Sequence, residues 1–85
     1  MYRLEYKKSV AKDLRVIPKQ QLRKIVRRIQ TLANEPRGSG ILKLQGEDQL
    51  YRVRQGDYRI IYNINDDVVT VLIIKVGHRK DVYER

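Results

Sequence analysis

The 85-residue sequence contains no cysteine and no long apolar run. Without cysteine there can be no disulfide, no thiolate metal site and no cysteine nucleophile. No segment approaches the roughly 18 apolar residues that a membrane-spanning helix needs. The alternating, charged start of the chain, residues 1–6, is unlike the apolar core of a signal peptide. These absences predict a cytoplasmic protein with no membrane partner.

Acidic residues are scarce: ten Asp and Glu stand against 19 Lys and Arg, giving a net charge of +9 and an isoelectric point near 10.1. The excess is uneven, because residues 1–42 carry 11 basic and 3 acidic groups, whereas residues 43–85 carry 8 and 7. A basic surface on so small a chain favours a polyanionic partner, such as nucleic acid, a membrane surface or an acidic protein.

The first 40 residues carry one strand pattern and two helix patterns. Alternation over residues 2–6 predicts a short strand. Ser9 suits the N-cap of a helix whose apolar face runs to Ile17, and Pro18 suits the first turn of a second helix. The second helix has an apolar stripe with a 3.6-residue period, made of Leu22, Ile25, Val26, Ile29, Leu32 and Ala33. Residues 34–40 then predict a helix stop and a loop.

The second half of the chain is patterned as strands. Strands are predicted at 51–54, 58–64 and 68–76, with turns at 55–57 and 65–67 and a break at Gly77. No repeat or linker divides the chain, so residues 1–85 are predicted to form a single domain. The predicted fold class is α+β, in the order β-α-α-β-β-β. It comprises an N-terminal strand, an αα-hairpin and a three-stranded antiparallel meander, and the strands form one curved sheet.

Two features admit a second interpretation. Asp66 and Asp67 could be a metal-binding carboxylate pair, but adjacent acidic residues in a turn segment favour a turn. The two helices could form a helix-turn-helix that binds DNA. The apolar stripe of the second helix favours instead a hairpin packed on the sheet.

Three arginines are predicted to share a surface. Arg52 and Arg54 alternate with the apolar residues of one strand, and Arg59 lies on the polar face of the next. If the hairpin pairs around Gly56, all three guanidinium groups reach one face. Like charges on neighbouring strands repel, so this clustering favours a bound anion. The alternative is an ordinary solvated sheet face.

Several short motifs together resemble toxins of the RelE/ParE superfamily, specifically the RelE branch, over essentially the whole chain. The segments that carry the resemblance are 43–44, 51–54, 56–62 and 76–83. The resemblance implies a ribosome-dependent endoribonuclease that cuts mRNA in the A site and is held inactive by an acidic RelB-like antitoxin. It also implies that no metal, organic cofactor or small-molecule cofactor takes part.

The resemblance also implies the site residues. The basic strand pair of the family falls on Arg52 and Arg54, its strand arginine on Arg59, its post-strand arginine on Arg79 and its C-terminal tyrosine on Tyr83. The best-studied family pattern has lysines at the first two positions, and an arginine is a poor proton acceptor. His78 is therefore the candidate acid or base, because its unperturbed pKa of about 6.5 suits proton transfer near neutrality. The alternative for His78 is an ordinary strand-end residue.

Six further basic residues are predicted to bind RNA. On the second helix these are Lys19, Arg23, Lys24, Arg27 and Arg28, expected to contact ribosomal RNA phosphates, and Lys43 is added from the strand half. Two rival functions remain open. One is a ParE-type inhibitor of DNA gyrase, and the other is a basic RNA-binding or ribosome-binding module without catalysis.

Overall fold

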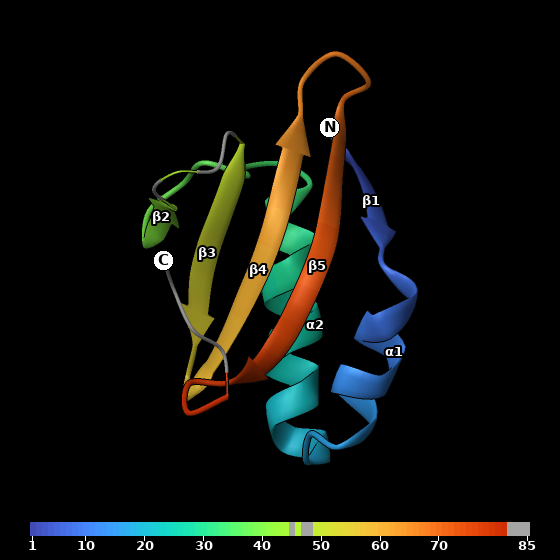
Figure 1. Cartoon of the computed structure of the whole chain (residues 1–85), viewed down its shortest axis with the longest axis vertical. Helices are drawn as coiled ribbons and strands as arrows, with labels where there is room; N and C mark the ends of the chain where they lie inside the picture. Colours follow the sequence, from blue (N-terminus) through green and yellow to red (C-terminus); the bar gives the residue numbers. More distant parts are fainter. Residues whose placement is uncertain (45, 47–48, 82–85) are drawn as a thin grey trace.

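A computed structural model describes residues 1–44, 46 and 49–81, and over these residues the chain forms two helices and five strands (Figure 1). The elements are β1 (Arg3–Tyr6), α1 (Lys8–Arg15), α2 (Lys19–Leu32), β2 (Ile41–Lys43), β3 (Leu50–Gln55), β4 (Tyr58–Asn65) and β5 (Thr70–His78). In Figure 1, α2 lies behind β4 and β5 and α1 lies beside β5, below β1. Both helices contribute to one core on the same side of the sheet, and no described helix covers the other side, which is called the open face below. The predicted α+β class is confirmed.

The strand order in the sheet is β1-β5-β4-β3-β2. β1 runs parallel to β5, and β3, β4 and β5 form the predicted antiparallel meander. β5 is an interior strand, as its apolar run predicts. The prediction lacked β2, which pairs with β3 at the sheet edge. Three residues are too few to display a period-two pattern, so the sequence gives no sign of this strand.

The two helices pack on the covered face as a hairpin. The buried stripe of α2 consists of Ile25, Ile29 and Leu32, and α1 contributes Val10. These side chains meet a sheet layer made of Val53, Ile60, Tyr62, Ile64, Val71, Ile73 and Val76. Since the apolar stripe of α2 is used in this core, the hairpin interpretation is confirmed and the helix-turn-helix alternative is wrong.

The predicted N-cap at Ser9 is wrong. α1 begins at Lys8, its N-cap is Lys7, and no side chain caps it. The Lys7 N–H donates to the Ile73 carbonyl at 2.9 Å, so the chain passes directly from the β1–β5 ladder into the helix. Pro18 occupies the N-cap of α2 rather than its first turn, and its carbonyl accepts the first helical hydrogen bond from the Leu22 N–H.

The boundaries of the last strand also differ from the prediction. β5 begins at Thr70, two residues after the start of the apolar run, because the Asn65 side chain accepts hydrogen bonds from the N–H groups of Asp67 and Val68 and extends the turn. It continues through Gly77, which pairs with Arg59, so the predicted break at Gly77 is wrong.

The turn interpretation of Asp66 is confirmed, because its carboxylate is occupied by donors from the rest of the fold. Arg37 donates to both carboxylate oxygens at 2.9 and 3.3 Å, and the Tyr2 hydroxyl donates at 2.6 Å. These donors, Arg37 first, lower the pKa of Asp66 below its usual range. Within the part of the chain that the structure describes, no cluster of three or more His, Asp or Glu residues has metal-binding geometry.

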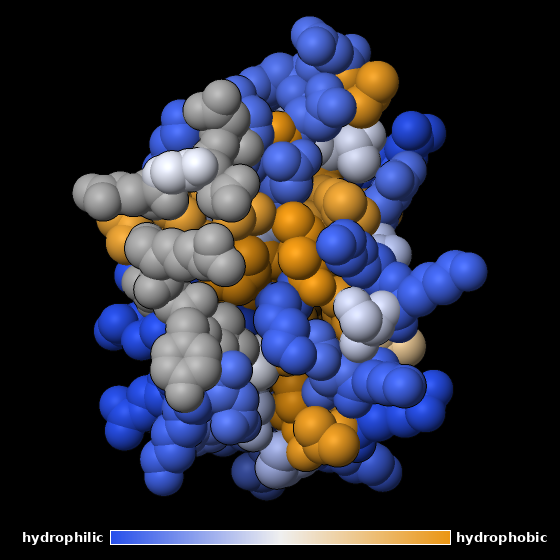
Figure 2. All heavy atoms as spheres, viewed as in Figure 1, coloured by the Kyte–Doolittle hydropathy of each residue, from blue (hydrophilic) through white to orange (hydrophobic). Residues whose placement is uncertain are grey.

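The open face of the sheet is partly apolar. Ile61 is buried there with Leu44, and Leu50 packs against them. Figure 2 views this face and shows an apolar centre surrounded by hydrophilic side chains. Neither helix among the described residues is long and apolar enough to cross a membrane.

Candidate nucleic-acid interface

The β3–β4 hairpin determines where the arginines lie. A two-residue turn at Gly56 and Asp57 joins the paired Gln55 and Tyr58, and Gly56 has a left-handed φ of 61° that glycine adopts without strain. This register sets Arg54 directly opposite Arg59.

Alternation along the two strands then puts all three arginines on the open face. Arg52 shares a face with Arg54 and lies opposite Ile61, whereas Val53 and Ile60 point into the helix-covered core. The predicted pairing around Gly56 and the shared arginine face are confirmed.

A small hollow at the end of the hairpin brings a further arginine to this face. Arg54, Arg59 and Arg79 line it together with the turn, and its volume is about 80 Å³. The Arg79 N–H donates to the Asp57 carbonyl at 2.7 Å, which folds the segment after β5 back onto the hairpin. The Arg79 guanidinium lies 3.9 Å from the Asp57 carboxylate, and both side chains are mostly exposed, so this pair neutralises little charge.

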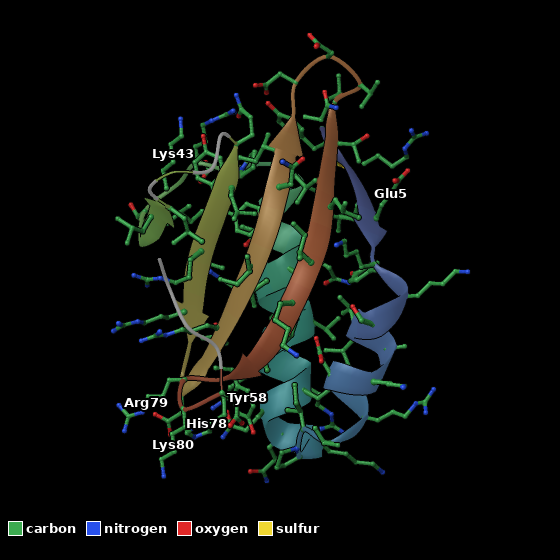
Figure 3. All side chains as sticks on the ribbon, in the orientation of Figure 1. Glu5, Lys43, Tyr58, His78, Arg79 and Lys80 are labelled. Carbon is green, nitrogen blue, oxygen red and sulfur yellow. The ribbon has the colours of Figure 1, made fainter. Side chains whose placement is uncertain are left out.

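His78 lies on the other side of the sheet. It pairs with Tyr58, so both rings project from the helix-covered face, and the rings meet edge to face with centroids 5.5 Å apart. Its Nδ1 accepts a hydrogen bond from the Lys80 N–H at 3.2 Å, and Nε2 is the ring nitrogen that takes no part in this contact. Figure 3 shows Tyr58, His78, Arg79 and Lys80 at one end of the sheet. The structure therefore brings Arg79, but not the His78 ring, to the face of the three strand arginines.

A β-bulge causes this placement of His78. Ile61 pairs with Lys75 and Tyr62 pairs with Ile73, so Ile74 is an extra residue in β5. The extra residue reverses the alternation of side chains along β5. Val76 and His78, which follow the bulge, therefore point toward the helices; without the bulge they would point to the open face.

The predicted RNA-binding residues divide into two groups. Lys19, Arg23, Lys24, Arg27 and Arg28 all lie on α2. Three of them, Lys24, Arg27 and Arg28, line a hollow of about 290 Å³ with Gln55 of β3. Lys43 pairs with Tyr51 at the far end of β3 and does not join this group (Figure 3). Tyr83 lies outside the described residues.

Sequence reasoning missed three residues that line a hollow of about 360 Å³ with His78 and Lys24. They are Gln21 on α2, Gln55 on β3 and Tyr58 on β4. The alternation of β4 assigns Tyr58 to the core face, which is correct. Tyr58 is the first residue of β4, at the end of the sheet, so its side chain is only half-buried. The two glutamines carry no sequence signal of their own.

A family model described as the ParE toxin of the type II toxin–antitoxin system, parDE, matches residues 4–83. The chain is 34% identical over 86 residues to the putative toxin RelE1 of Methanocaldococcus jannaschii, covering 98% of this chain and 96% of that protein. It is 31% identical over 85 residues to toxin RelG of Mycobacterium tuberculosis, covering 99% and 98%.

Solved structures of the same kind share the fold. The crystal structure of the archaeal RelE–RelB complex from Pyrococcus horikoshii matches with a TM-score of 0.82 and 34% identity, over 95% of this chain and 98% of that chain. The toxin–antitoxin complex RelBE2 of Mycobacterium tuberculosis matches with a TM-score of 0.82 and 30% identity, over 92% and 98%. The fold is thus that of a type II toxin. The chain belongs to the ParE toxin family of the RelE/ParE superfamily, and its named relatives are of RelE type, which confirms the resemblance seen in the sequence.

Proposed function

We propose that this toxin is a ribosome-dependent endoribonuclease that cuts mRNA in the A site and so blocks translation in the cytoplasm. The observation that carries the proposal is the hollow lined by Arg54, Arg59 and Arg79, with Arg52 on the same face. Guanidinium groups bind phosphate oxygens through paired, charge-assisted hydrogen bonds.

The proposed reaction needs only the RNA and protein side chains. The 2′-hydroxyl oxygen attacks the adjacent phosphorus and loses its proton, and the bond from phosphorus to the 5′ oxygen breaks. The 5′ oxygen takes up a proton, so the products are a 2′,3′-cyclic phosphate and a 5′-hydroxyl end. The arginines contribute by stabilising the charge that develops on the phosphoryl oxygens.

Proton transfer is assigned to a residue other than the arginines, because a guanidinium stays protonated at neutral pH. We propose His78 for this role, acting through Nε2 because Nδ1 is engaged by the Lys80 N–H. Its ring lies on the other side of the sheet, in the hollow next to the arginine hollow, so the proposal requires the RNA to pass around the end of the hairpin. His78→Ala should then lower the cleavage rate by about 10²–10⁴-fold and remove one limb of the pH–rate profile. An unchanged rate and profile would transfer the role to Tyr83, Lys80 or the ribosome. Tyr83 is proposed to orient the nucleotide, so Tyr83→Ala should also impair cleavage.

We propose that the basic residues of α2 bind ribosomal RNA phosphates at a distance from the cleaved bond. Replacing Arg23 and Arg27 with Ala should weaken ribosome binding and reduce its salt dependence by roughly 0.7–0.9 log units per lost contact, while cleavage at saturation persists. The matched control replaces Lys12 and Arg15 of α1, which removes the same charge from the other helix. Equal losses in both pairs of variants would show that only net charge matters.

An acidic RelB-like antitoxin is the proposed protein partner, supported by the RelE–RelB complexes among the structural relatives. A segment of such a partner that covers Arg54, Arg59 and Arg79 would neutralise the toxin by occupying the phosphate site. Co-purification with a small acidic protein encoded nearby tests this proposal. A chain that is harmless when expressed alone and captures no such protein would contradict it.

Inhibition of DNA gyrase is the second candidate function, favoured by the ParE description of the matching family. Brief expression separates the two candidates. New 5′ ends inside the codons of translated mRNA support the ribonuclease. Accumulated DNA breaks with intact mRNA support gyrase inhibition.

A further inference from the structure

Three hollows follow one another around the end of the β3–β4 hairpin. The first is lined by Lys24, Arg27 and Arg28, and the third by Arg54, Arg59 and Arg79. The middle hollow shares Lys24 and Gln55 with the first, and it shares the turn at Gly56 and Asp57, together with Tyr58, with the third. The shared lining makes the three hollows one continuous surface that runs from α2 to the open face of the sheet.

The middle hollow differs in chemistry from its neighbours. Its walls include the half-buried rings of Tyr58 and His78 and the side-chain amides of Gln21 and Gln55. The Gln21 amide oxygen reaches the hairpin turn, where it lies 3.5 Å from the position that a Cβ on Gly56 would occupy. With a volume of about 360 Å³, this hollow has room for a nucleobase, and its amides offer both donors and acceptors to a base edge.

Charge argues that the middle hollow holds a base rather than a phosphate. Asp57 lines both the middle and the third hollow, but three arginines outweigh its charge in the third hollow. Among the described residues, Lys24 is the one Lys or Arg that lines the middle hollow, and there Asp57 can accept a hydrogen bond from an amino group on a base. Proteins that bind single-stranded nucleic acid combine a basic groove for the backbone with aromatic side chains on which bases stack. Here the middle hollow supplies the aromatic rings, and the hollows on either side of it supply the basic side chains.

We propose that the middle hollow is a base-binding subsite for single-stranded RNA, with a phosphate of the same strand in the third hollow, at Arg54, Arg59 and Arg79. This proposal depends on the proposed function in one respect: the third hollow would hold the phosphate that is cleaved. The subsite would then hold the nucleotide next to the cleaved bond, and Tyr58, Gln21 and Gln55 would set which base is preferred there.

The test is a titration of the isotope-labelled full chain with a short RNA, followed by NMR. All 2′-hydroxyls of the RNA are methylated, so binding is measured without cleavage. A series of RNAs then carries one abasic nucleotide at each position in turn. We expect one position at which loss of the base weakens binding roughly 5-fold to 150-fold, the range for stacking of one base on an aromatic side chain. The amide signals of Gln55, Gly56 and Tyr58 should move during the titration.

Two variants connect that position to the subsite. In both Tyr58→Leu and Gln21→Ala, removing the same base should weaken binding less than it does in the wild type. In Tyr58→Leu the loss of affinity should be smaller than about twofold. Tyr6→Leu is the matched control, because Tyr6 is an exposed tyrosine on β1, at the opposite edge of the sheet. It should keep the full sensitivity. Gln21→Ala alters a helix surface position, so it remains informative if Tyr58→Leu fails to fold.

Three results would overturn the proposal. The sensitive position could respond identically in the wild type and both variants, no position could depend on its base, or the shifted signals could lie away from the hairpin. An acidic peptide that moves these signals when RNA does not would assign the surface to a protein partner instead. A chain that cleaves mRNA without base-dependent binding loses this subsite and keeps the proposed function. A chain that binds in this way but never cleaves keeps the subsite and loses the proposed function.

Discussion

Removing one arginine from the open face should stabilise the free toxin while weakening its anion site. Arg54 is exposed and lies directly opposite Arg59 on the neighbouring strand. Like charges in that relation destabilise a strand pair by roughly 0.2–1 kcal/mol. For a domain of this size, 1 kcal/mol corresponds to about 4–8 °C in Tm, so Arg54→Gln should raise the Tm by roughly 1–8 °C at low salt. Near 1 M salt the gain should shrink, because the Debye length falls to about 3 Å.

Adding phosphate should raise the Tm of the wild type above that of Arg54→Gln. A ligand present at ten times its Kd stabilises the folded state by about 1.4 kcal/mol, and the wild type should gain more than the variant because it keeps the full cluster. Arg15→Gln is the matched control: it removes the same charge from the last turn of α1, where a cation is favourable, so it should not raise the Tm. The reasoning is refuted if Arg54→Gln lowers the Tm at low salt, or if phosphate stabilises wild type and variant equally.

Three further predictions concern the frame that holds the site. Asp13→Ala removes a carboxylate, 11% exposed, that accepts the Val76 N–H at 3.1 Å, so unfolding by urea should show a loss of about 1–3 kcal/mol; a loss below about 0.5 kcal/mol would contradict this. Tyr62→Phe removes the 2.7 Å hydrogen bond to the buried Pro36 carbonyl and should cost a similar amount by the same assay; unchanged stability would contradict this. Because the pKa of Asp66 is lowered in the folded state, its carboxylate stabilises the folded protein fully at pH values above the unfolded pKa of about 3.9. This stabilisation is lost as the pH falls through the lower pKa of the folded state. Asp66→Asn should therefore flatten the fall in Tm below about pH 4, and an unchanged slope would count against the Arg37 contact.

The fold class and the arginine face could be predicted because each depends on a local pattern. The 3.6-residue stripe on α2 and the alternation on β3 and β4 decide which side chains face the core. The turn at Gly56 then fixes the register, and the register alone sets Arg54 opposite Arg59.

The side on which His78 lies could not be predicted, because it depends on the bulge at Ile74. Val71 to Val76 is a nearly continuous apolar run, so the reversal of phase leaves no trace in the pattern. The middle hollow was missed for a related reason. Gln21 and Tyr58 come from elements that meet only after α2 packs on the sheet, and neither residue type in isolation indicates a binding site.

Whether the toxin cuts RNA at the hollow of Arg54, Arg59 and Arg79, as proposed, is tested most directly by the chemistry of the product ends. Purified toxin is mixed with ribosomes that carry a defined mRNA codon in the A site, and the ends of the fragments are analysed. We expect a cut within that codon that leaves a 2′,3′-cyclic phosphate and a 5′-hydroxyl. We also expect Arg59→Ala and Arg79→Ala to lose the cut at every pH while still binding ribosomes. Intact mRNA with the wild-type toxin, or full cleavage by both variants, would contradict it.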